Sequence, residues 1–145
     1  MSEKIVVGTD GSDTAKQAVA EAVRLAKALD AELHVVTAFE PLRGTKVRAP
    51  EGAQKFYGPM SNELARSIID EAESTARTAG VNVDPHMVQK GPADALLEVA
   101  KEVGASLIVV GNQGMSGARR LLGSVPNKVS HEATCNVLIV STRRS

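Results

Sequence analysis

The sequence predicts an α/β protein, a single doubly wound sheet of five parallel strands with helices on both faces. One observation is that short β-branched runs alternate with longer segments of helical periodicity along the 145 residues. Another is that residues 4–9 and 105–110 are apolar without polar alternation, which is typical of strands covered on both faces. Because crossovers between parallel strands are right-handed, the connecting helices form two layers. Residues 1–145 are predicted to form one domain.

The beginning of the chain predicts a strand, a helix and a second strand. Residues 4–9 are a short aliphatic run that ends at an Asp-Gly pair. In residues 12–29 the apolar positions recur at helical spacing, and Ser12 or Asp13 is expected to cap this helix. Residues 32–38, with the sequence ELHVVTA, are predicted to form the second strand.

The middle of the chain predicts a helix and a weaker strand. Residues 62–79 have helical spacing, and Gly80 is expected to end the helix. Its buried stripe is expected to consist of Leu64, Ile68, Ala72, Ala76 and Ala79. Residues 81–88 predict the third strand, and because Pro85 cannot donate a hydrogen bond to a neighbour, this strand is expected at an edge of the sheet.

The last part of the chain predicts two further pairs of helix and strand. Residues 92–103 form a helix that is introduced by Gly-Pro and closed by a glycine. Residues 105–110, with the sequence ASLIVV, are the most strand-like segment of the chain. A short helix at residues 126–133 then precedes the last predicted strand, residues 136–142.

The composition limits the classes of partner. The formal net charge is zero, so neither nucleic acid nor an anionic membrane is an expected partner. No apolar run is long enough to span a bilayer, and the N-terminal apolar stretch is too short for a signal peptide. The one cysteine, Cys135, excludes an internal disulfide and fits a cytoplasmic setting.

Two strand ends indicate a ligand site. In a doubly wound sheet, ligands bind beyond the carboxyl ends of the strands, where the strand order reverses. The first strand ends in GTDGS, residues 8–12, and the fourth ends in GNQG, residues 111–114. If these strands are neighbours, the two loops border one crevice.

The glycines after the fourth strand favour an anion, and a phosphate in particular. Gly111 and Gly114 allow the backbone amides to approach a ligand closely. Gly123 and Ser124 precede the last helix, whose free amides and dipole also favour an anion, with Ser124 expected as the N-cap. An Arg-Arg pair between the two glycine segments can add positive charge. The alternative is a solvated loop followed by an ordinary capped helix.

Together, several segments of the chain resemble a known family, the universal stress proteins. The resemblance covers nearly the whole chain and rests on VVGTDGS, ELHVV, GPADALLEVA and LIVVGNQGMSGARRLLGSVPNKVSHEATCNVLIV. It implies a five-stranded sheet in the order 3-2-1-4-5. One branch of the family binds ATP, with Mg²⁺ bound beside the nucleotide, through the pattern Gly-x2-Gly-x9-Gly-(Ser/Thr). The resemblance therefore implies an ATP-binding, stress-response regulatory protein.

The resemblance also implies which residues form the nucleotide site. They are Thr9, Asp10, Ala38, Val110, Gly111, Gly114, Gly123, Ser124 and Val125. The backbone near Ala38 would contact the adenine edge, and Asp10 would lie near the adenine or would meet Mg²⁺ directly or through water. Asp10 also has an ordinary interpretation, because an Asp-Gly pair after a strand commonly forms a turn or caps a helix.

One departure from the family pattern concerns the glycine spacing. The pattern has nine residues between its second glycine and the Gly-(Ser/Thr) pair, whereas Met115 to Leu122 are eight. A deletion within a loop leaves both ends in place, whereas a deletion within a helix rotates the downstream residues by about 100°. Gly117 favours the loop interpretation. The alternative functions are therefore a dimeric protein-interaction module that binds no nucleotide, and a binder of cyclic AMP.

The residues offer little support for catalysis beyond a slow, incidental ATPase. His34, His86 and His131 are far apart in sequence and lack metal-ligand spacing. Cys135 is expected to be inert packing.

The last predicted strand suggests a homodimer. Members of the family commonly dimerise through this strand, and a bare apolar edge at residues 136–142 invites pairing with a second copy. The alternative is an edge that the charged tail, residues 143–145, protects.

Overall fold

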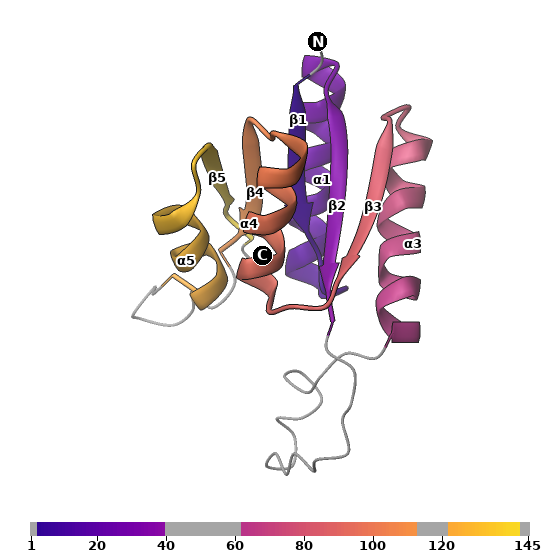
Figure 1. The fold of residues 1–145 in the computed structure, drawn as a ribbon. Helices are drawn as coiled ribbons and strands as arrows, with labels where there is room; N and C mark the ends of the chain where they lie inside the picture. The colour runs from indigo at the N-terminus through magenta and orange to yellow at the C-terminus, as the bar shows by residue number, and fades with distance from the viewer. Residues whose placement is uncertain (1–2, 40–61, 113–121, 143–145) are drawn as a thin grey trace.

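The computed structural model describes residues 3–39, 62–112 and 122–142. Helices and strands alternate along these residues (Figure 1). In chain order the elements are β1 (Lys4–Gly8), α1 (Asp13–Leu29), β2 (Glu32–Ala38), α3 (Asn62–Thr78), β3 (Val83–Val88), α4 (Pro92–Val103), β4 (Leu107–Gly111), α5 (Ser124–Glu132) and β5 (Asn136–Val140).

The five strands form one parallel sheet in the order β3-β2-β1-β4-β5, as predicted. Val7 of β1 pairs with Val35 of β2 on one side and with Val109 of β4 on the other. Pro85 lies in β3 at one edge of the sheet, which confirms the prediction for that strand. All strands run in the same direction, so their carboxyl ends lie together at one end of the sheet (Figure 1).

Two helical layers cover the two faces of the sheet. α1 and α3 lie on one face, and α4 and α5 lie on the other (Figure 1). Side chains of β1 alternate between the layers, so Ile5 and Val7 pack in the α1/α3 core while Val6 packs in the α4/α5 core. All three are fully buried, which explains why β1 is apolar without alternation.

α1 begins and ends at recognisable caps. The side chain of Ser12 accepts a hydrogen bond from the amide of Ala15 at 3.2 Å, so Ser12 is the N-cap and Asp13 is the first helical residue. Such a cap contributes about 1 kcal/mol. At the other end Asp30 adopts a left-handed conformation with φ of 56°, and its amide donates to Ala26 and Lys27. The sequence thus placed both ends of this helix to within one residue.

The buried face of α3 differs from the predicted stripe. Ala72 and Ala76 are buried as expected, but Ala65 and Ile69 complete the stripe in place of Leu64 and Ile68. Leu64 is 52% exposed. Both stripes have helical spacing, so periodicity alone does not choose between them. Small Ala65 is fully buried against the rest of the protein, while Ile68 lies beside the loop that follows β1.

Two strands begin later than predicted because the residues before them finish the preceding helices. The amide of Val81 donates to Ala76 at 3.0 Å, and the amide of Ala105 donates to Ala100 at 2.9 Å. β3 and β4 therefore start two residues further on, at Val83 and Leu107. None of the helices in the described ranges is both long and apolar enough to cross a membrane.

Candidate functional site

The sheet has its topological switch point between β1 and β4. β1 pairs with β2 on one side and with β4 on the other. The chain leaves β1 for β2, toward one edge of the sheet, whereas it leaves β4 for β5, at the opposite edge. Adjacent loops that diverge in this way leave a crevice beyond the carboxyl ends of the two strands. The structure therefore brings the carboxyl ends of β1 and β4, from which the two predicted loops start, side by side.

Thr9 organises the loop after β1. Its amide donates to the carbonyl of Val36 at 3.0 Å, and its carbonyl accepts from the hydroxyl of Thr37 at 3.2 Å. The hydroxyl oxygen of Thr9 accepts from the amide of Gly11, which has φ of 85°, a conformation that favours glycine. Thr9 is buried, so it holds the loop in shape from within.

Asp10 is exposed at the mouth of this crevice. Its Oδ1 accepts a hydrogen bond from the amide of Ser12 at 2.9 Å, which is an Asx turn leading into α1. Asp10 therefore has the structural role in a turn that was considered for it. It does not preclude a second role, because a carboxylate has lone pairs for several partners and this one is open to solvent.

The end of β4 packs closely against the side chain of Thr142 at Gly111. A Cβ atom at this position would lie 3.2 Å from Cγ2 of Thr142 and 3.7 Å from the carbonyl oxygen of Thr14. Thr142 would therefore have to shift by a few tenths of an ångström to admit a side chain at this position, whether or not a ligand binds. The next residue, Asn112, uses Oδ1 to accept from both the amide and the hydroxyl of Thr142.

Asn112 shapes the end of β4, although the sequence did not indicate a role for it. Its side chain joins the ends of β4 and β5, and its amide donates to Val140 at 3.0 Å. The sequence feature that could have indicated this role is an Asn directly after the glycine that ends a strand, because Asn side chains commonly hydrogen-bond to backbone groups.

The start of α5 differs from the prediction. The N-cap is Gly123 rather than Ser124, and glycine has no side chain that could bond to the first amides. Ser124 is the first helical residue and is exposed, so the helix starts two residues before the predicted Pro126. The reason is that Gly123, with ψ of 167°, already has the extended backbone of a cap, and its carbonyl accepts from Asn127 at 3.1 Å.

Three predicted residues have side chains that pack inward. Val110, Val125 and Ala38 all belong to the α4/α5 core, where Val110 is 4% exposed and the other two are half-buried. Val110 can therefore face a ligand only through its backbone. Gly114 and the Arg-Arg pair lie outside the described residues, as does most of the segment with the shortened spacing.

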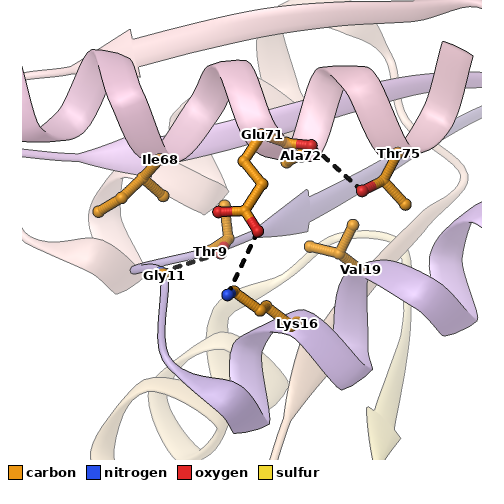
Figure 2. Close-up of a pocket in the computed structure, with 8 residues that line it drawn as sticks. All are labelled: Thr9, Gly11, Lys16, Val19, Ile68, Glu71, Ala72 and Thr75. Carbon is orange, nitrogen blue, oxygen red and sulfur yellow. Dashed lines mark hydrogen bonds and ion pairs between the residues drawn. The ribbon is translucent and has the colours of Figure 1, made fainter.

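A small hollow lies beside the loop after β1, between α1 and α3 (Figure 2). Its volume is about 80 Å³. Lys16 and Glu71 form an ion pair of 3.3 Å across its opening. Ligand pockets are usually roughly 300–1,000 Å³, so this hollow is too small to hold a nucleotide. It shares Thr9 and Gly11 with the crevice, but its other lining residues belong to α1 and α3.

Two of the histidines that are far apart in sequence lie together in the structure. Nδ1 of His34 lies 2.9 Å from Nε2 of His86, because β2 and β3 are neighbours. Burial lowers the pKa of His86, with the nearby His34 acting in the same direction, while Asp84 and Glu102 raise it. Histidines 52 residues apart in sequence thus form one cluster, away from the crevice between β1 and β4.

Cys135 has the surroundings expected of packing. It is half-buried against the α4/α5 core and is a free thiol. Burial raises the pKa of the Cys135 thiol. A raised pKa reduces the thiolate fraction, which is the reactive form.

The strand order and the two helical layers define a doubly wound α/β protein, and the comparisons with known proteins agree with that fold. The model of the universal stress protein family matches residues 1–141. A universal stress protein of Mycobacterium tuberculosis is 41% identical over 140 residues, which cover 95% of each chain. The chain therefore belongs to the universal stress protein family.

Two solved structures of this family are similar to the chain and contain nucleotides. One is a universal stress protein in complex with cAMP, with 40% identity and a TM-score of 0.77 over 97% of this chain and 98% of its own. The other is the universal stress protein from Archaeoglobus fulgidus in complex with dAMP, with 25% identity and a TM-score of 0.71 over 96% of this chain and 98% of its own.

Proposed function

We propose that this protein binds an adenine nucleotide, ATP with Mg²⁺, at the switch point between β1 and β4, and acts as a stress-response regulator. The observation that carries the proposal is the adjacency of the β1 and β4 ends, because Gly111 ends β4 and the exposed Asp10 lies in the loop that follows β1. Relatives with cAMP and dAMP bound support an adenine nucleotide as the ligand class.

The phosphates would bind to backbone amides of Gly111, Gly114 and the first turn of α5. A helix start leaves amides without intrahelical acceptors, and the helix dipole adds a partial positive charge. At α5 the N-cap is Gly123, which has no side chain to occupy those amides. Ser124 is exposed at the first helical position, where its hydroxyl can donate to a phosphate or ribose oxygen. Val125 would contribute through its backbone.

The adenine and the metal would occupy the β1 and β2 side of the crevice. Ala38 ends β2 with its side chain in the core, so its backbone is the group that can meet an adenine edge. Thr9 shapes the loop, and Val110 would contribute through its backbone in the same way. The residues fit Mg²⁺, because this ion commonly takes one or two carboxylates, the phosphates and water. Asp10 would supply that carboxylate.

Regulation rather than catalysis is the expected use of the nucleotide. Binding at this edge would change the surface that the protein offers to partners, and hydrolysis would be slow and incidental. The expected location is the cytoplasm, because its reducing environment keeps thiols such as that of Cys135 free.

We further expect a homodimer formed through β5. In the described part of the chain β5 pairs with β4 and with no other strand, so one edge is open to a second copy. Four of its five residues, Val137–Val140 in sequence VLIV, are only partly buried in the single chain. Sedimentation would show a dimer, and Ile139→Lys would shift it toward monomer.

A cyclic AMP binder is the second candidate, because the solved structure with 40% identity contains that ligand. The decisive experiment is to denature the purified protein and identify any nucleotide released. Calorimetric titrations with ATP, ADP and cyclic AMP, each with and without Mg²⁺, would then rank the ligands. Tighter binding of ATP with Mg²⁺ supports the first proposal, and tighter binding of cyclic AMP supports the second. If none of these nucleotides binds, the remaining candidate function is a protein-interaction module that binds no nucleotide.

A further inference from the structure

Four ionisable side chains gather on one face of the sheet at the amino-terminal part of β2 and β3. Glu32 and His34 are two residues apart in β2, and Asp84 and His86 are two residues apart in β3, so each pair points to one face of the sheet. His34 pairs in register with Asp84, which brings the two pairs together. The nucleotide site proposed above lies at the opposite, carboxyl ends of the strands.

Three of these side chains present ligand atoms at the corners of one small triangle. Nδ1 of His34 lies 2.9 Å from Nε2 of His86 and 3.8 Å from Oδ2 of Asp84. Nε2 of His86 lies 4.0 Å from the same Oδ2. Around a tetrahedral zinc ion, with bonds of about 2.0–2.2 Å, ligand atoms lie roughly 3.3–3.5 Å apart. The triangle reaches that geometry through side-chain shifts of roughly half an ångström.

Glu32 supplies the second, independent feature of a metal site. Its Oε1 lies 2.9 Å from Nε2 of His34, on the side of the ring away from the triangle. Metal-binding histidines almost always donate their other ring N–H to a carboxylate, a carbonyl or water, which fixes the tautomer. Because an ionised carboxylate only accepts hydrogen bonds, His34 carries its proton on Nε2. In the neutral ring of His34, the lone pair of Nδ1 then faces His86 and can accept a hydrogen bond from it.

We propose that His34, Asp84 and His86 bind a divalent transition metal, Zn²⁺, with water completing the coordination and Glu32 positioning His34. Two imidazoles and one carboxylate favour zinc over Mg²⁺ or Ca²⁺, which prefer oxygen ligands. The ion replaces the hydrogen bond between the rings, and His86 moves its proton from Nε2 to Nδ1. The +2 charge is balanced by the carboxylates of Asp84 and Glu32.

The exposed fractions of these side chains suit a rigid ligand and a path by which the ion can enter the site. The His34 side chain is 4% exposed and cannot move away, while the Asp84 side chain is 62% exposed and opens the site to solvent. The ion would also tie the edge strand β3 to β2.

The test is calorimetric titration of the metal-free, full-length protein with Zn²⁺, together with thermal unfolding in Zn²⁺ and in Mg²⁺. We expect one saturable zinc site and a rise in unfolding temperature with Zn²⁺. Asp84→Asn and His86→Gln should abolish both, and Glu32→Gln should weaken binding by roughly 10–100-fold. Asp84 is exposed and His86 only partly buried, so these two variants should fold.

The matched control is His131→Gln, which removes an exposed histidine of α5 and should leave zinc binding unchanged. Zinc binding that survives in both Asp84→Asn and His86→Gln would overturn the proposal, since the ion would then be held elsewhere. Failure of the wild-type protein to bind Zn²⁺, or equal loss in the His131→Gln control, would also overturn it. The result does not depend on the nucleotide, because no ligand belongs to both sites.

Discussion

Both the amide and the hydroxyl of Thr142 donate to one oxygen of Asn112, Oδ1, with the amide 3.0 Å away. This contact joins the end of β4 to the residues after β5, at the place where Gly111 packs against Thr142. Thr142 is 6% exposed, so water cannot readily replace the Asn112 oxygen. The side chain of Asn112 therefore holds one wall of the proposed nucleotide crevice.

Asn112→Ala should destabilise the protein, because it leaves the amide and the hydroxyl of Thr142 buried without an acceptor. A loss of roughly 1–3 kcal/mol in the free energy of unfolding is expected for such a group. Urea unfolding would measure it. Asn82→Ala is the control, since Asn82 is exposed and the carbonyl that accepts from Leu33 is retained. Equal stability of the two variants would show that the Asn112 contact contributes nothing.

Gly111→Ala should lower both stability and nucleotide affinity. The added Cβ would lie 3.2 Å from Thr142, so the neighbour must move, and overpacking of this kind costs roughly 1–3 kcal/mol. Gly91→Ala is the matched control, because no atom lies within 4 Å of its added Cβ. Unfolding curves and ATP titrations of both variants would test this. An unchanged affinity in a folded Gly111→Ala protein would remove Gly111 from the site.

Asp10→Asn should weaken ATP binding in the presence of Mg²⁺ by about tenfold, or ~1.4 kcal/mol. The Asn oxygen can still accept from the amide of Ser12, so the turn into α1 is retained. Only the charge that would meet the metal is lost. Titrations with Mg²⁺ and with a chelator would separate the two effects. The same substitution at exposed Asp13 in the first turn of α1 is the control. If Asp10→Asn binds like wild type with Mg²⁺ present, Asp10 does not serve the metal.

Cys135 should react slowly with iodoacetamide at mildly alkaline pH. Burial raises the pKa of the thiol, so the thiolate is a smaller fraction than in a free cysteine and grows only as the pH rises further. The folded protein should therefore be alkylated at least several-fold more slowly than the unfolded protein, as followed by mass spectrometry. Similar rates with and without denaturant would contradict this.

Local patterns in the sequence were sufficient for most of the secondary structure. The β-branched runs, the cap at Ser12 and the proline in β3 each act through a neighbour a few residues away or through the backbone itself, so their effects can be read from sequence. The strand order came from the family resemblance, whereas the proposed site came from the glycines at two strand ends together with that resemblance. The structure agrees with the strand order, and it places Thr9 and Gly111 at adjacent strand ends.

The tertiary structure decided which of several equivalent local patterns is used. α3 has two apolar stripes of equal periodicity, and contact with the sheet selected the one with Ala65 and Ile69. The bond between Asn112 and Thr142 spans 30 residues, and that between His34 and His86 spans 52. Sequence alone determined the elements, because helix and strand formation depend on nearby residues. These side-chain pairs required the folded sheet, because only the pairing of strands brings such distant residues within bonding distance.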